Sequence, residues 1–215
     1  MGDNSKKQRR NFNRDIADIV LYPVYQKLGN HVPSWISPNS ITLAGSLIGV
    51  IGSLLIIFIN SPIVYILTPI CYIIYHLFDT LDGYHARRTG KESAIGDFLD
   101  HSLDGIVVLI FYIALIYRFE LNHIFYVLLV AMRAYDTTLF QCTLRATGNP
   151  FNPPVGPATE VWLFSIGYIL CFLLPEYQNT IVFYGCVFAC IAIVISISTT
   201  YMHTLRNIAS HKGTD

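Results

Sequence analysis

The chain has 215 residues, of which 53% are hydrophobic and 13% charged, and its formal net charge is zero. Soluble domains carry about a quarter charged residues, so we expect much of this surface to face lipid. The basic residues are not interleaved with aromatic residues as on a nucleic-acid-binding surface, which argues against a nucleic-acid partner.

The first region, residues 1–37, combines a basic arm with a helical pattern. This region contains six Lys and Arg residues and three Asp residues, so its net charge is positive. Basic segments beside a membrane are attracted to anionic lipid headgroups. Apolar residues then recur at helical spacing, while charged residues fall elsewhere on the helical wheel. The apolar set is Ile16, Ile19, Val20, Val24 and Leu28. This pattern predicts an amphipathic helix that lies in the membrane interface.

Long apolar segments fill most of the remaining chain. A membrane-spanning helix needs about 20 mostly apolar residues. Six segments approach or reach that length: 40–60, 62–83, 96–117, 123–144, 158–175 and 180–203. We therefore predict an all-α integral membrane protein with six transmembrane helices. Its membrane domain covers residues 38–205, and residues 206–215 form a short tail.

Basic residues set the expected orientation. With six spans, both termini lie on one side, together with the loop that carries Arg87, Arg88 and Lys91. Of the 14 Lys and Arg residues, all except Arg118 and Arg133 fall on that side. The positive-inside rule therefore places both termini and this loop in the cytoplasm.

The polar stretch 79–104 joins the second and third predicted spans, and its acids follow helical spacing. On the first helix, Asp79, Asp82, Gly83 and Ala86 fall at i, i+3, i+4 and i+7, which is one face. Arg87 comes one turn after Gly83. This face therefore combines two carboxylates with two very small residues.

The second helix of this stretch repeats the arrangement. Asp97, Asp100, His101 and Asp104 again fall at i, i+3, i+4 and i+7. Gly96 precedes them, so the turn into this helix is expected to be small and tight.

Four carboxylates, from Asp79, Asp82, Asp100 and Asp104, are thus expected to converge near the ends of two spans. Their repulsion in a low-dielectric setting requires a balancing positive charge. An all-oxygen cluster is the ligand set of hard cations such as Mg²⁺ or Mn²⁺, whereas zinc would require His and Cys at tetrahedral spacing. Metal, arginine and open space together indicate a phosphate-bearing substrate. The alternative is a set of exposed loop charges.

The same residues resemble the signature of the CDP-alcohol phosphotransferase family. Its pattern reads Asp-x-x-Asp-Gly-x-x-Ala-Arg, eight residues, then Gly-x-x-x-Asp-x-x-x-Asp. The sequence fills every fixed position, with Asp79, Asp82, Gly83, Ala86, Arg87, Gly96, Asp100 and Asp104. The segment "WISPNSITLAG" at 35–45 also looks like the family's entry to the first span.

The resemblance implies a reaction and a set of roles. An acceptor hydroxyl would split a CDP-alcohol at its pyrophosphate and release CMP, in a homodimer that holds two divalent ions per site. Asp79, Asp82 and Asp100 would be the main ligands of the ions, and Asp104 would complete the site. Gly83, Ala86, Arg87 and Gly96 would lie against the nucleotide, and Asn39 and Thr42 would reach the same cavity.

The segments around both helices look most like the choline and ethanolamine phosphotransferases. In that group a Glu stands where this chain has Asp97, and a His follows the third motif acid, as His101 does here. The segment 143–161 also resembles that group and places Arg145 and Glu160 near the site. The eukaryotic members are longer, with about four further spans. The resemblance therefore implies a donor such as CDP-choline or CDP-ethanolamine and diacylglycerol as acceptor.

His101 is the leading candidate for the general base. Histidine ordinarily titrates at a pKa of about 6.5, which suits proton removal from a hydroxyl. Asp97, one turn earlier, could orient its ring, and Asp104 and Glu160 are alternative bases. Arg133 and Asp136, at i and i+3 within the fourth span, form either an intrahelical pair or a substrate contact.

Three other functions compete with this enzyme. A CDP-diacylglycerol-dependent transferase that acts on inositol phosphate, glycerol phosphate or serine is the alternative within the same class. A small transporter would spread its charges along several spans, whereas here they crowd at the ends of two. A catalytically silent scaffold would be expected to lack one of the motif aspartates, and all four are present.

Overall fold

The computed structural model describes residues 15–120, 124–148 and 151–211, and every regular element in these ranges is a helix. The elements are α2 (Ile16–His31), α3 (Pro38–Phe58), α4 (Val64–Thr89), α5 (Ala94–Arg118), α6 (Ile124–Thr147), α7 (Pro157–Leu173), the short 3-10 helix η1 (Pro175–Tyr177) and α8 (Gln178–His211). The predicted all-α class is confirmed, and a helix stands at each of the six predicted segments. Most of the basic arm lies outside the described residues.

Four helical segments are long and apolar enough to cross a membrane: α3, α4, α5 and the segment Pro175–Ala209, which comprises η1 and most of α8. These indicate an integral membrane protein. Helix α7 is apolar but has only 17 residues. Helix α6 has 24 residues but carries Arg133 and Asp136 near its middle. Four helical segments are therefore candidate spans by length and composition, and the six-span topology stays a prediction.

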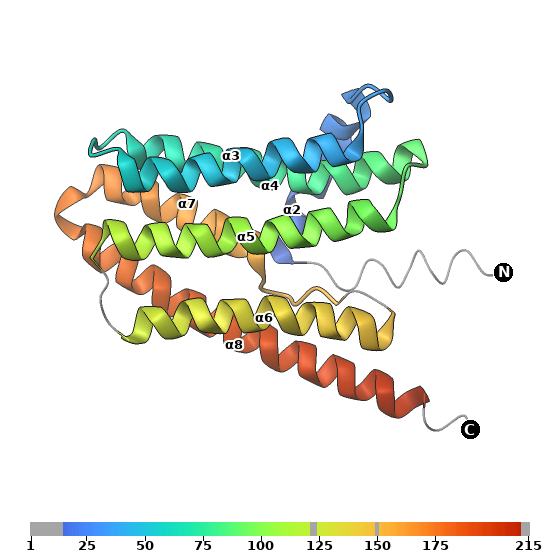
Figure 1. The fold of residues 1–215 in the computed structure, drawn as a ribbon. Coiled ribbons are helices and arrows are strands. Elements are labelled where there is room, and N and C mark those ends of the chain that lie inside the picture. The colour runs from blue at the N-terminus through green and yellow to red at the C-terminus, as the bar shows by residue number, and fades with distance from the viewer. Residues whose placement is uncertain (1–14, 121–123, 149–150, 212–215) are drawn as a thin grey trace.

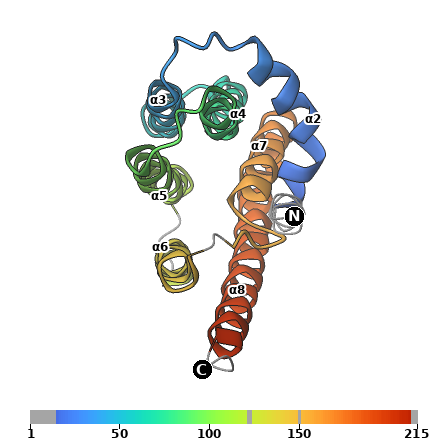
Figure 2. The ribbon, with the colours of Figure 1, turned by 90° about the vertical axis from the view of Figure 1, so that its right-hand side faces the viewer.

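The helices form a bundle with its polar connections gathered at one end. Helix α3 packs on α4 and α5, α4 packs on α7, and α6 packs on α8. The end-on view shows α2 on the outside, beside α7 and α4 (Figure 2). Figure 1 shows α2, the α4–α5 connection and the C-terminal end of α8 at the same end of the bundle.

Glycines let α3 approach its neighbours closely. A Cβ atom at Gly45 would lie 2.7 Å from Cβ of Phe78 on α4. A Cβ atom at Gly49 would lie 2.7 Å from Cγ1 of Val107 on α5. Small residues at such contacts are a common means of packing helices in membranes. The close packing fixes α4 and α5, which carry the acidic motif, against a common support.

A short turn places α4 and α5 antiparallel. Gly90 ends α4 with φ of 67°, a left-handed conformation that favours glycine, and the Lys91 N–H donates to the Ala86 carbonyl at 2.9 Å. Ser93 then caps α5, accepting a hydrogen bond from the Gly96 N–H at 3.0 Å. This connection brings the last turns of α4 beside the first turns of α5.

A buried carboxylate joins α2 to α7. Asp15 caps α2 by accepting from the Ala17 N–H at 3.0 Å. It also accepts from the backbone N–H groups of Gly156 at 2.9 Å and Thr159 at 3.0 Å, at the start of α7. Asp15 is one of the charged residues that helical spacing places off the apolar stripe of the predicted amphipathic helix. The structure instead buries it to 3% exposure, because it satisfies the free N–H groups of two helix starts.

Candidate active site

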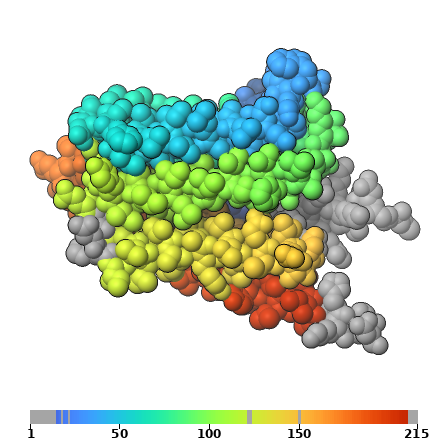
Figure 3. All heavy atoms as spheres, in the orientation of Figure 1, coloured from blue at the N-terminus to red at the C-terminus, as the bar shows by residue number. Residues whose placement is uncertain are grey.

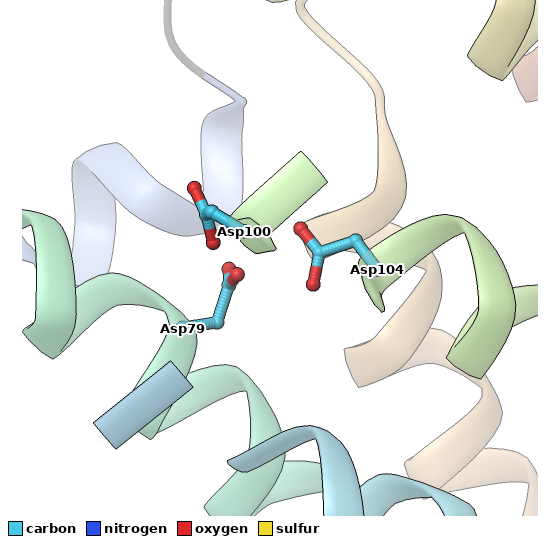
Figure 4. A group of neighbouring side chains, drawn as sticks. All are labelled: Asp79, Asp100 and Asp104. Atoms are coloured by element: carbon cyan, nitrogen blue, oxygen red, sulfur yellow. The ribbon is translucent and has the colours of Figure 1, made fainter. Parts of the chain in front are cut away.

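Three of the motif aspartates meet where α4 and α5 lie side by side. Asp79 comes from α4, and Asp100 and Asp104 come from α5 (Figure 4). One carboxylate oxygen from each lies within 4.8 Å of the other two. We call these three residues the aspartate trio. Their convergence follows from the i, i+4 spacing on α5 and from the antiparallel packing across the Gly90 turn.

The fourth motif aspartate lies beside the trio and has a different partner. The carboxylate of Asp82 is buried, and it accepts a hydrogen bond from the hydroxyl of Thr42 on α3. Asp82 is not part of the 4.8 Å group, although it interacts electrostatically with Asp79 and Asp100. The four acids that were expected to converge are thus arranged as the trio and one neighbouring acid, Asp82. Asp82 is bound by Thr42 of α3.

The trio fits a hard divalent cation. All of its donor atoms are carboxylate oxygens, the preferred ligands of Mg²⁺ and Mn²⁺. Oδ1 of Asp100 is buried and has no hydrogen-bond partner among the described residues. A buried acceptor without a partner is costly, and a metal ion would supply the missing interaction. The residues that would hold such an ion are Asp79, Asp100 and Asp104, with Asp82 beside them.

The small and basic motif residues surround this centre on the α3 and α4 side. The guanidinium of Arg87, which is exposed, reaches back over Gly83, where an added Cβ would lie 3.2 Å from Nη1. Across the α4–α5 turn, a Cβ at Gly96 would lie 3.0 Å from Oδ1 of Asn39. Ala86 is half-buried on α4. Larger side chains at Gly83 or Gly96 would therefore displace polar groups.

His101 lies next to the trio on α5. One ring nitrogen is 3.9 Å from an Asp100 oxygen, and the other is 3.6 Å from Oδ1 of Asp97. The ring also packs edge-on against Phe140 of α6, with centroids 5.1 Å apart. The side chain is about a quarter exposed, so solvent or substrate can reach it. This position is compatible with a base, and the role itself stays a prediction.

Glu160 and Arg145, both expected near the site, occupy different environments. Glu160 is buried on α7, where it binds Arg133 of α6 and accepts from the Tyr112 hydroxyl at 2.9 Å. Arg133 also pairs with Asp136 at 2.8 Å, as expected for an intrahelical pair. Arg145 is exposed on α6, and no hydrogen bond or ion pair involves it within the described part of the chain.

Two polar contacts of the site were missed from the sequence. The Tyr75 hydroxyl donates to Oδ1 of Asp104 at 2.7 Å and so fixes one member of the trio. Tyr75 precedes Asp79 by four residues on α4, so its helical face could have indicated this contact. Ser196 of α8 donates to Asp136 at 2.7 Å, a contact between distant segments for which no sequence signal exists.

The fold and the site together define a helical membrane protein with an acidic centre suited to divalent metal. A sequence profile of the family described as CDP-alcohol phosphatidyltransferase matches residues 35–200, which include all four motif aspartates. The chain therefore belongs to the CDP-alcohol phosphatidyltransferase family.

Individual relatives match part of the chain. A choline/ethanolaminephosphotransferase of Arabidopsis thaliana is 34% identical over 98 residues, and a cholinephosphotransferase of Saccharomyces cerevisiae is 33% identical over 98 residues. Each match covers 42% of this chain and 25% of the relative, so the matched region spans a quarter of these proteins. A CDP-diacylglycerol–serine O-phosphatidyltransferase of Encephalitozoon cuniculi is 31% identical over 109 residues, covering 48% of this chain and 28% of that protein.

Among solved structures, the fold is similar to the phosphatidylinositol phosphate synthase of Mycobacterium tuberculosis. The structure with CDP-DAG bound has a TM-score of 0.61 at 18% identity, covering 83% of this chain and 92% of that one. The structure in complex with manganese and citrate has a TM-score of 0.62 at 17% identity, covering 83% and 88%. The likeness establishes a shared fold over most of both chains.

Proposed function

We propose that the protein transfers a substituted phosphate group from a CDP-alcohol to an acceptor hydroxyl and releases CMP. The observation that carries this proposal is the aspartate trio, formed by Asp79, Asp100 and Asp104 within the complete family motif. The motif residues around the trio offer both a metal-type centre and an arginine, Arg87, for a pyrophosphate.

The proposed reaction is a displacement at phosphorus. The acceptor oxygen forms a new bond to the phosphorus that carries the alcohol, and the bridging P–O bond to CMP breaks, so that CMP leaves with the electron pair. His101 takes the proton of the acceptor hydroxyl, and Asp97 orients its ring. Two bound divalent ions, Mg²⁺ or Mn²⁺, would neutralise the pyrophosphate and the charge that develops on CMP.

Further residues have supporting roles in the proposal. Thr42 holds Asp82 in place through its hydroxyl, and Asn39, at the start of α3, lies beside Gly96 of α5. Ala86 and Gly83 leave room for the nucleotide against α4. Glu160 acts through Arg133, because their ion pair fixes α7 against α6.

The proposed donor is CDP-choline or CDP-ethanolamine and the proposed acceptor is diacylglycerol, since several of the matched relatives are choline or choline/ethanolamine phosphotransferases. A second candidate is a CDP-diacylglycerol donor with a small alcohol as acceptor. The match to a serine transferase and the fold shared with a CDP-DAG-bound synthase favour that candidate.

The proposal includes a topology. Helices α3 to α8 form six spans, with both termini and the α4–α5 turn in the cytoplasm, and the protein acts as a homodimer. Helix α2 lies in the interface, and its apolar stripe supports this, because Ile16, Ile19, Val20 and Val24 are each at least half exposed. A basic arm precedes this helix and would meet anionic headgroups.

One assay tests the proposal. The purified protein is incubated with CDP-choline, CDP-ethanolamine or CDP-diacylglycerol, each with diacylglycerol, inositol phosphate, glycerol phosphate and serine, and CMP is measured. We expect CMP release either with CDP-choline or CDP-ethanolamine as donor or with CDP-diacylglycerol as donor, and not with both classes. We expect no CMP release from the Asp100→Asn variant. Absence of CMP in every pair, from folded protein with divalent metal present, would refute the proposed activity.

A further inference from the structure

A polar cleft lies between α5 and α6, and His101 is part of its lining. Its volume is about 450 Å³, within the range of small-molecule sites, about 300–1,000 Å³. Its polar lining comes from Asp97, His101 and Ser102 of α5 and from Thr137, Thr138 and Gln141 of α6. We call it the α5/α6 cleft. The two helices lie side by side on the face shown in Figure 3.

His101 connects the α5/α6 cleft to the aspartate trio. His101 lines the cleft, and one of its ring nitrogens is 3.9 Å from Asp100 of the trio. A hydroxyl bound in the cleft could therefore meet His101 on one side, while a donor bound at the trio meets the same region from the other side. Reacting groups must be held together in this way for a displacement to proceed.

The polar groups of the cleft suit an alcohol. The amide of Gln141 has no hydrogen-bond partner among the described residues, and it offers both donors and an acceptor. The hydroxyls of Thr137 and Thr138 donate to carbonyls of their own helix at 3.0 and 2.8 Å, which leaves their oxygens free to accept. Ser102 likewise donates to the Leu99 carbonyl at 3.2 Å.

The charge of the cleft selects against anions. No Lys or Arg lines it within the described residues, and Asp97 contributes a carboxylate. A phosphorylated acceptor would meet this negative charge without a counter-charge, whereas a neutral hydroxyl would not. The basic residue suited to phosphate, Arg87, lies on α4 beside Gly83. Donor and acceptor chemistry are thus separated across α5.

The outer rim of the cleft is apolar. Phe98 lines the cleft and is 69% exposed, and Ile95 beside it is 68% exposed. Both side chains are on α5, which is long and apolar enough to cross a membrane. Exposed apolar side chains at this position are compatible with contact to acyl chains. A molecule with a neutral hydroxyl end and a hydrocarbon body matches both the interior and the rim.

We propose that the α5/α6 cleft is the acceptor subsite and that it admits a neutral lipid alcohol of the diacylglycerol class from the bilayer, with Gln141 binding its glycerol oxygens. This inference rests on the proposed function for its chemistry. It goes beyond that function by assigning the acceptor a cleft of its own, with an entry route from the bilayer that is separate from that of the nucleotide.

A labelling experiment tests the subsite without relying on turnover. The full chain in lipid nanodiscs is irradiated with a diacylglycerol that carries a diazirine close to its glycerol group, and the labelled peptides are identified by mass spectrometry. We expect labelling within residues 94–105 and 137–141, with loss of labelling when unlabelled diacylglycerol competes. Labelling confined to other helices, or labelling that does not respond to competition, would overturn the proposal.

Kinetics of three variants provide the second measurement. Gln141→Leu removes the amide, and Thr138→Trp fills the cleft. Leu128→Trp adds the same bulk at a residue of α6 that is 54% exposed and outside the cleft. Loss of one hydrogen bond should raise the KM for diacylglycerol about three- to tenfold in Gln141→Leu, and Thr138→Trp should raise it further. The KM for the CDP-alcohol should stay unchanged, and Leu128→Trp should behave like the wild type.

The outcomes separate the two proposals. An unchanged acceptor KM in both cleft variants overturns the acceptor subsite, even where CMP release is normal. An increase in the donor KM instead would assign the cleft to the nucleotide and likewise overturn it. If the wild type releases no CMP from any donor, the proposed function fails, and the competition in the labelling experiment still decides whether the cleft binds the neutral lipid.

Discussion

Removal of the buried cation from the α6–α7 contact should destabilise the fold. Arg133 is 2% exposed, its Nη1 lies 2.8 Å from Asp136, and its Nη2 binds Glu160. The variant Arg133→Gln would leave two buried carboxylates without a counter-charge. Among the described residues, the neutral hydroxyls of Ser196 and Tyr112 would remain as hydrogen-bond donors to them, at 2.7 and 2.9 Å.

The size of the effect follows from this geometry. Removal of one partner of a buried ion pair costs about 3–5 kcal/mol, a large part of a typical unfolding free energy of about 5–15 kcal/mol. For a chain of this length, that corresponds to a fall in Tm of about 6–20 °C. Thermal unfolding in detergent, followed by the fluorescence of Trp35 and Trp162, measures it. Arg145→Gln is the matched control on α6, since that arginine is exposed and should change stability by less than about 0.5 kcal/mol.

A double variant sharpens the test. In Arg133→Gln with Glu160→Gln, one of the two uncompensated charges is absent, so part of the lost stability should return. A Tm for Arg133→Gln equal to that of Arg145→Gln would refute the reasoning. If CMP release were lost at the same time, Arg133 would be assigned to substrate contact instead of to packing.

Further predictions concern the site. Chelation of divalent metal should abolish CMP release, and added Mg²⁺ or Mn²⁺ should restore it; turnover in metal-free buffer would contradict a metal role for the trio. Asp79→Asn, Asp82→Asn and Asp100→Asn should each reduce CMP release to near background in folded protein, and a variant that keeps most of its activity is not a main ligand. His101→Ala should lower kcat by about 10²–10⁴ while metal and CDP-alcohol binding, measured calorimetrically, persist. Thr42→Val should weaken activity more than Thr42→Ser, which keeps the hydroxyl that binds Asp82; equal activities would show that this hydrogen bond is dispensable.

Helical spacing explains why much of the site could be predicted. Residues at i and i+4 lie one turn apart whatever surrounds the helix, so the spacing of Asp100 and Asp104 alone places them on one face. The apolar segments similarly indicated helices, because their length is set by the membrane thickness. The connection at Gly90 is short, and two long helices joined by a short turn pack antiparallel.

Contacts between distant segments were beyond this reasoning. The Asp15 carboxylate accepts hydrogen bonds from Gly156 and Thr159, which are more than 140 residues away in the sequence. Helical periodicity does not indicate which helix packs on which. Glu160 was expected at the substrate site because of its position in a family-like segment. The structure pairs it with Arg133, whose partner could not be chosen from spacing within α6.

Two groups of acids in the same bundle differ in how their charge is balanced. In the first group, Asp136 and Glu160 share the guanidinium of Arg133, so the protein itself supplies the counter-charge. In the trio, no Lys or Arg of the described residues forms an ion pair with any member, and an oxygen of Asp100 stays without a partner. Carboxylates that crowd together at a half-buried site need a counter-charge. The contrast supports the proposal that a divalent cation balances the trio, and the anionic diphosphate of a donor would then bind to that cation.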